Sequence, residues 1–218
     1  MRKRVASRSS VGPSTAPLAP IPSVQPTYDV LACYALNIPS SIDAEKLHKL
    51  RGKYQIPYDI HTYLPATGEW CCTPNSPGIG IYDAYMLGGL SLPLGAFARE
   101  ILTRLGISPN QLNPNDWRII VAMQVLWREV FEGNRPFTVD EFLYCYKPSR
   151  ISQSLGFYQF SAQGSNCRMI RSLPTSDREW KKEFFFVSSP WVGDPFEVGR
   201  DTFPPLVSDW GHLHPKGM

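Results

Sequence analysis

Hydrophobic side chains recur at helical spacing across the middle of the chain. In residues 96–105 ("AFAREILTRL"), Phe97, Ile101 and Leu105 fall on one face of a helix. Gly106 follows at the position where a helix commonly ends. This pattern predicts an amphipathic helix that packs one face against a core.

The longest helix is predicted over residues 114–131 ("PNDWRIIVAMQVLWREVF"). Asn113 can cap it, and Pro114 suits the first helical position, where a missing N–H costs nothing. At about 100° per residue, Arg118, Glu129 and Glu132 gather on one narrow polar face. Apolar side chains surround the rest: Trp117, Ile119, Ile120, Val121, Met123, Leu126 and Trp127. We therefore expect this helix to be buried on nearly all sides.

The stretch "LTRLGISPNQL", residues 102–112, has the rhythm of a DNA-binding helix-turn-helix. A second helix capped by Ser108 would have only about five residues before it ends at Pro114. Proline ends a helix because it lacks an N–H and clashes with the preceding turn. Such a helix is too short to lie in a DNA groove. A core helix from Pro114 is the favoured interpretation, and a DNA-reading element is the alternative.

Shorter elements are expected before these helices. Ser41 or Asp43 can cap a helix that runs to about Lys53. Residues 58–64 alternate with a period of two, which predicts a strand, and the composition of residues 65–78 is typical of a loop.

Two further helices are predicted from their ends. The segment 79–89 begins extended, turns helical near Tyr82 and ends on the glycine pair at 88–89. Thr138 and Glu141 have capping-box spacing and predict the start of another helix.

Strands are expected in the C-terminal third. Residues 156–162 and 167–173 are predicted to flank a tight turn at 163–165. Within residues 176–189, one short helical turn is expected to lead into a buried strand at 184–187. The fold class that follows is α+β. It is a helix-rich single domain around one long buried helix, with a small antiparallel sheet from the 156–187 region.

Charge divides the chain unevenly, although its net charge is only +3. Residues 1–28 contain four basic side chains and no acid, so the remaining residues carry a net charge of −1. The proline- and serine-rich residues 1–28 are predicted to form a disordered basic arm, because they offer little apolar surface to bury. A solvated tail, a weak nuclear address, a phosphate contact and a transit peptide all stay open for it. We expect one domain over 29–189 and a proline- and glycine-rich tail over 190–218.

Cysteine usage and hydropathy indicate an intracellular protein of the nucleus or cytoplasm. The five cysteines form no C-x-x-C pair, and no apolar run of about 18 residues suggests a membrane span. We expect no membrane partner. Of the adjacent Cys71 and Cys72, one thiol is expected to be buried and the other exposed.

Motifs that carry chemistry are missing from the sequence. There is no G-x-S-x-G, no P-loop, no Asp-Thr/Ser-Gly triplet and no Tyr-x-Asp-Asp. The four histidines and five cysteines show no zinc-ligand spacing. We predict no catalytic, metal-binding or cofactor-binding residues and no cofactor.

Basic residues next to aromatic ones give the only candidate contacts, because aromatic rings can stack on bases while cations bind phosphates. The candidates for weak nucleic-acid binding are Arg2, Lys3, Arg4 and Arg8 in the arm, and Arg168, Arg171, Lys181 and Lys182 in the domain. The alternative for the last region is that Phe184–Phe186 are core and that both lysines lie on a solvated turn.

Several stretches resemble a known plant family. They include "LRGKYQIP", "LPLGAFAREILTRLGISPNQLNPNDWRIIVAMQVLW", "TVDEFLYCYK", "GFYQFSA" and "LPTSDREWKKEFFFV". From about Ile42 to Val187 the chain resembles the plant family named for gypsy-type transposons, whose domain is also called a transposase domain. The resemblance implies a plant source and a retrotransposon origin, and it carries no catalytic residues to transfer.

The leading hypothesis is a non-enzymatic, retrotransposon-derived domain that acts through protein or nucleic-acid association. Self-association, other protein partners and weak nucleic-acid binding through the arm are all open. The alternatives are an element-encoded transposase or integrase-like enzyme and a capsid-like assembly module. The predicted strands argue against the capsid-like module.

Overall fold

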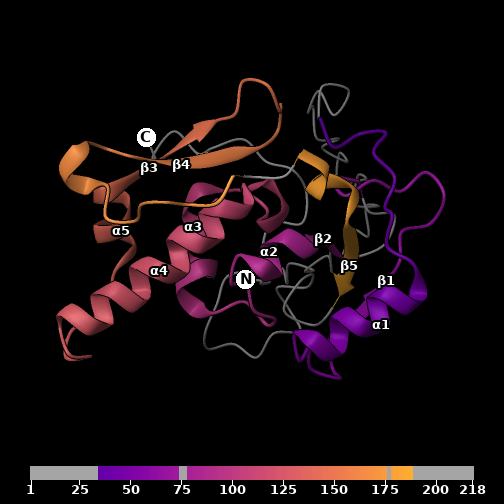
Figure 1. Ribbon diagram of the computed structural model, residues 1–218, viewed down its shortest axis with the longest axis horizontal. Helices are drawn as coiled ribbons and strands as arrows, with labels where there is room; N and C mark the ends of the chain where they lie inside the picture. Colours follow the sequence, from indigo (N-terminus) through magenta and orange to yellow (C-terminus); the bar gives the residue numbers. More distant parts are fainter. Residues whose placement is uncertain (1–33, 74–77, 176–177, 189–218) are drawn as a thin grey trace, which may run out of the picture.

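The computed structural model describes residues 34–73, 78–175 and 178–188 (Figure 1). Helices in this part of the chain are α1 (Ala44–Lys53), α2 (Asp83–Leu87), α3 (Ala96–Leu105), α4 (Pro114–Val130) and α5 (Val139–Cys145). The 3₁₀ helices are η2 (Pro109–Gln111), η3 (Ser165–Cys167) and η4 (Arg178–Lys182). The strands are β1 (His61–Tyr63), β2 (Ile79–Tyr82), β3 (Tyr146–Arg150), β4 (Tyr158–Ala162) and β5 (Phe184–Ser188). The expected α+β class is confirmed.

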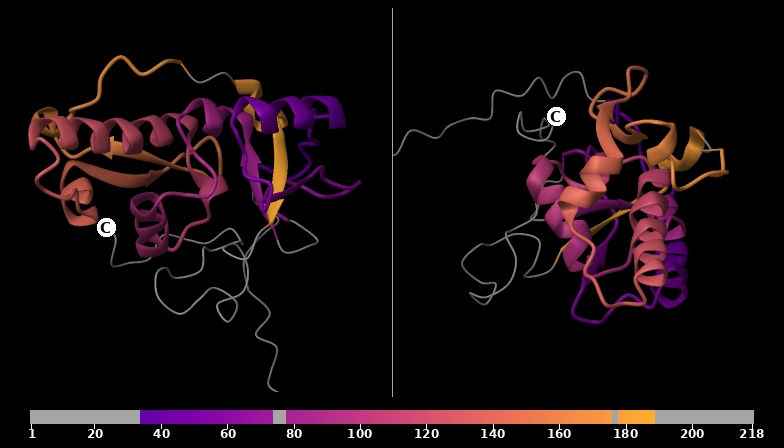
Figure 2. Two further views of the ribbon diagram at one scale, coloured as in Figure 1. Left: turned by 90° about the horizontal axis from the view of Figure 1, so that it is seen from below. Right: turned by 90° about the vertical axis from the view of Figure 1, so that its left-hand side faces the viewer.

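The described residues form two separate antiparallel sheets. In the first, β5 lies between β1 and β2, with Thr62 opposite Val187 and Gly80 opposite Phe186. In the second, β3 pairs only with β4. Figure 1 shows the three-stranded sheet beside α1 and the β3–β4 pair above α4 and α5. Figure 2 shows α4 running along the edge of the molecule.

The sequence predicted one small antiparallel sheet from the 156–187 region, and the strands observed there differ from that prediction. β4 and β5 belong to different sheets, and the strand expected over 167–173 is wrong. Residues 165–167 form η3, and residues 168–173 have no regular structure. Instead of pairing with a strand, the backbone N–H of Ile170 donates to Tyr146 Oη at 3.1 Å.

The long helix is confirmed with its expected cap. Asn113 Oδ1 accepts from the backbone N–H of Asn115, and Pro114 is the first helical residue. Its buried positions all lie in the first ten residues, and Met123 is the last of them. The expectation of burial all round is wrong for the last turns, where Val125 and Val130 are 55% and 64% exposed.

The stretch with helix-turn-helix rhythm is part of the core. Ser108, Asn110 and Gln111 are at most 1% exposed, and they form the single turn η2. Asn110 Nδ2 donates to the carbonyl of Cys71 at 2.7 Å, and Tyr85 Oη donates to the carbonyl of Asn110 at 3.0 Å. These buried side chains cannot enter a DNA groove, so the DNA-reading alternative is wrong.

Several local predictions are confirmed. Asp43 caps α1 by accepting from the Lys46 N–H at 2.7 Å. α3 ends at Gly106, whose φ of 67° lies in the left-handed region that favours glycine. Thr138 and Glu141 form the predicted capping box of α5. The expectation that one of Cys71 and Cys72 is exposed is wrong, because both are buried.

Candidate nucleic-acid interface

A long acid-free segment folds into one part of the molecule. From Phe142 to Ser176 the sequence contains no Asp or Glu, but it contains Lys147, Arg150, Arg168 and Arg171. The described residues of this segment form the end of α5, β3, β4, η3 and the irregular stretch after them. We call this part the basic lobe (residues 142–175). The lobe is positive, although the chain after residue 28 is close to neutral.

A cavity of about 890 Å³ lies where the basic lobe meets α4. Its apolar wall combines Ile119 of α4, Tyr146 of β3 and Phe160 of β4 with Ile170 and Leu173. Its polar lining comes from Ser161, Gly164, Ser165, Arg168, Arg171 and Ser172. The cavity therefore has a mainly apolar wall, in which Tyr146 and Phe160 are 2% and 6% exposed, beside guanidinium and hydroxyl groups.

Hydrogen bonds fix the irregular stretch that closes the cavity. The bond from Ile170 N–H to Tyr146 Oη holds its middle, and Asn115 Nδ2 donates to the carbonyl of Pro174 at 2.9 Å. Arg171 Nε donates to the carbonyl of Arg168 at 3.4 Å, which couples the two arginines. The stretch is thus attached both to the hairpin and to the start of α4.

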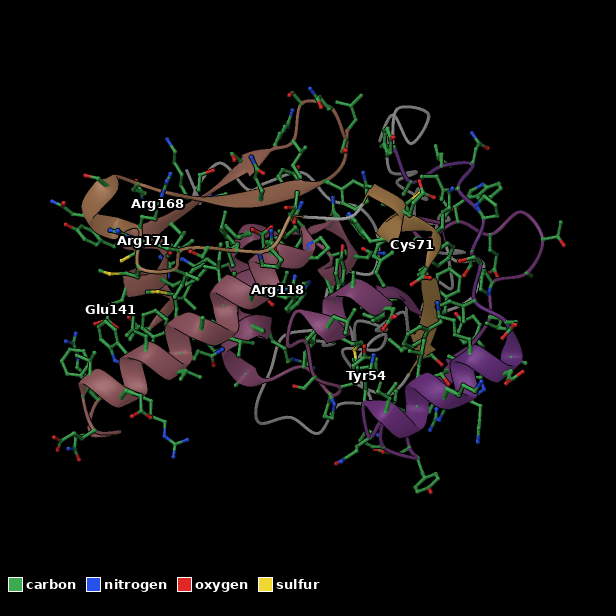
Figure 3. All side chains as sticks on the ribbon, viewed as in Figure 1. Tyr54, Cys71, Arg118, Glu141, Arg168 and Arg171 are labelled. Carbon is green, nitrogen blue, oxygen red and sulfur yellow. The ribbon has the colours of Figure 1, made fainter. Side chains whose placement is uncertain are left out.

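Both arginines of the cavity are exposed. Among the described residues, the ion pairs involve other cations: Lys46, Lys49, Arg104, Arg135 and Lys182. Figure 3 shows Arg168 and Arg171 near one another above α5. Arg118, in the middle of the view, binds Asn115 Oδ1 at 3.1 Å. Arg168 and Arg171 take part in none of the ion pairs of the described residues.

Asp116 links the start of α4 to β4, whose Phe160 lines the cavity. Its carboxylate accepts from the N–H of Phe160 at 2.8 Å and from the N–H of Asn113 at 2.9 Å. Loss of solvent raises the pKa of Asp116 to about 7, while these two hydrogen bonds act to lower it. The bond to Phe160 positions β4 on α4, and the raised pKa of Asp116 leaves its carboxyl group partly protonated near neutral pH.

The structure does not bring Lys181 and Lys182 together with the two arginines. η4 lies beside β5, away from α5 (Figure 1). Lys181 Nζ donates to Ser154 Oγ at 3.0 Å and lies 4.2 Å from the ring centroid of Tyr34, and burial lowers its pKa. Lys182 pairs with Glu179, which raises the pKa of Lys182. Phe184–Phe186 are buried in the core, as the alternative interpretation predicted.

The other predicted contacts, Arg2, Lys3, Arg4 and Arg8, lie outside the described residues, as does the tail after residue 189. Sequence reasoning missed Lys147 and Arg150, although counting charge over windows of the chain would have found the acid-free segment. In the described ranges, no group of three or more His, Cys, Asp or Glu is placed to hold a metal ion. No helix in this part of the chain is long and apolar enough to cross a membrane.

Fold and site together define a small α+β domain with a cavity that is apolar inside and basic at its rim. Residues 81–148 match the family model described as "Putative gypsy type transposon". The match confirms the resemblance expected from the sequence, and it supports an origin from a transposable element. It runs from the second half of β2 to the middle of β3, so Ile119 and Tyr146 lie inside the matched segment while Arg168 and Arg171 lie after it. Comparisons with curated proteins and with solved structures gave no match.

Proposed function

We propose that this transposon-derived domain is a non-enzymatic module that associates with nucleic acid through the basic lobe. The observation that carries the proposal is the acid-free segment, whose Arg168 and Arg171 lie exposed at the cavity without an acidic partner among the described ion pairs. Cations in such a position bind phosphates and release counterions when they do so.

The cavity favours a single strand over a duplex. Its wall includes the rings of Tyr146 and Phe160, and its volume of about 890 Å³ exceeds what one base fills. An unpaired base can enter such a cavity and contact its apolar wall, while the neighbouring phosphates meet Arg168 and Arg171. The bases of a duplex are stacked and paired, so they are not free to enter.

The test is a binding titration with a labelled single strand and a labelled duplex. Its starting protein is the full chain with Arg2, Lys3, Arg4 and Arg8 changed to Ala, which removes the charge of the arm. In that background R168A/R171A tests the lobe. K49A/R128A is the matched control, because it removes two exposed cations elsewhere.

We expect the arm-neutralised chain to bind the single strand more tightly than the duplex. R168A/R171A should weaken that binding at least tenfold and reduce the slope of log K against log salt by roughly 1.4, since each phosphate contact on a single strand contributes about 0.7. Equal affinities for R168A/R171A and K49A/R128A would contradict the proposal. A metal-dependent nuclease activity that disappears on carboxylate substitution would contradict its non-enzymatic part.

A further inference from the structure

Two half-buried cysteines lie at the edge of the cavity. Cys145 ends α5 and directly precedes Tyr146, while Cys167 ends η3 and directly precedes Arg168. They are 22 positions apart in sequence, and the whole β3–β4 hairpin lies between them. Both residues that follow them line the cavity.

Backbone and side-chain contacts bring the two thiols together. The N–H of Gln163 donates to the carbonyl of Cys145 at 2.8 Å, and Gln163 Nε2 donates to the carbonyl of Leu143 at 2.6 Å. Cys167 Sγ lies 4.0 Å from the carbonyl oxygen of Tyr144. Burial, followed by the neighbouring Cys167 thiol, raises the pKa of Cys145. These contacts therefore place two free cysteines beside one another at the base of the β3–β4 hairpin.

We propose that Cys145 and Cys167 are a redox-sensitive pair that forms a disulfide across the base of the hairpin under oxidising conditions. Cys71 and Cys72 differ because they are buried in the core, away from an oxidant. In a reducing compartment the disulfide would be transient, as is usual for sensing pairs. The proposal does not depend on nucleic-acid binding.

The chemistry can proceed through glutathione disulfide as the oxidant. The Cys167 thiolate attacks one sulfur of glutathione disulfide, forms a mixed disulfide and releases one glutathione thiolate. Cys145 loses its proton and attacks the Cys167 sulfur, and the second glutathione leaves as a thiolate. Two cysteine thiols are oxidised, glutathione disulfide is reduced, and the two protons pass to the released glutathione.

The test incubates the folded full chain, carrying C33S, with glutathione disulfide. Intact mass and peptide mapping are then measured. We expect the mass to fall by two hydrogen atoms and the map to show a Cys145–Cys167 link, with Cys71 and Cys72 reduced. The melting temperature should rise by roughly 5–10 °C, because the link closes a loop in the unfolded chain, and dithiothreitol should reverse the rise.

C145S and C167S are the matched variants. C145S should leave a glutathione adduct on Cys167, and neither variant should show the rise in melting temperature. A link that forms only in denaturant would overturn the proposal, as would stable glutathione adducts on both cysteines of the folded protein. Neither result would bear on the binding titration, so failure of this proposal is distinguishable from failure of the proposed function.

Discussion

At the scale of single residues, Asp116 joins the core to the candidate site. It is 2% exposed, and it connects the start of α4 to β4 through the N–H of Phe160. No cation pairs with it among the described ion pairs. A buried carboxylate of this kind opposes folding when it is ionised and does so much less when it is protonated.

Because the carboxyl group of Asp116 is buried, the stability of the folded protein should depend on pH. The pKa of Asp116 is raised to about 7 in the folded chain, whereas an unfolded chain ionises near its ordinary value of 3.8. Between these values the folded state binds more protons, so the free energy of unfolding should fall as pH rises from about 4 to about 7. The contribution is at most on the order of 1.4 kcal/mol per pH unit.

Denaturant unfolding of the wild-type chain, D116N and D59N between pH 4 and 8 measures this contribution. D116N cannot ionise and should lack the fall that wild type shows. D59N removes an exposed carboxylate and should keep it. Parallel curves for wild type and D116N would show that Asp116 does not titrate in this range.

At the scale of elements, the contact between α2 and α4 depends on a residue without a side chain. Gly88 follows α2, and a Cβ placed there would lie 2.7 Å from the carbonyl oxygen of Pro114 and 3.1 Å from Trp117 Cβ. The backbone of α4 cannot move away cheaply, because Pro114 is at its capped start. Any larger residue at position 88 must push the two helices apart.

The substitution G88A should therefore destabilise the protein by roughly 1–3 kcal/mol through this overpacking. The matched control is G52A in α1, where a Cβ would meet nothing within 4 Å. Because alanine has a higher helix propensity than glycine, G52A should stabilise the protein by about 0.5–1 kcal/mol. Thermal or denaturant unfolding compares the two, and equal effects would refute the packing argument.

Which elements the sequence could predict depends on how local their causes are. The Asn113 cap, the Gly106 end and the Thr138–Glu141 box each involve a few neighbouring residues, and all three are confirmed. β3 was missed because Pro148 lies within it, and proline in a strand usually argues against one. The structure accommodates Pro148 because β3 has a single partner strand.

The hydrophobic pattern of the sequence could not predict which strands pair when they lie far apart along the chain. β5 pairs with β1 and β2, which lie about a hundred residues earlier, and a buried apolar run such as Phe184–Val187 fits many partners. Likewise, the apolar period of α4 continues past Met123, although the elements that cover it do not extend that far. Helical periodicity identifies a face of a helix but not where its neighbours end.

At the scale of the whole molecule, charge is separated by the fold. The basic lobe carries four cations and no acid, so the rest of the chain after residue 28 has a clear acidic excess. The near-neutral total therefore hides a segment that contains four cations and no acid. Sequence reasoning named Arg168 and Arg171 because aromatic residues lie near them, but the same reasoning grouped them with Lys181 and Lys182, which the fold places elsewhere.

The central claim is that the basic lobe, rather than the arm alone, contacts nucleic acid. The most direct measurement is photo-crosslinking of the full chain to a single strand with photoreactive bases, followed by mapping of the crosslinked peptides. The account predicts crosslinks within residues 146–173, around Tyr146 and Phe160, because a base in the cavity lies against those rings. Crosslinks confined to residues 1–28 would contradict it and would leave protein contacts as the role of the domain.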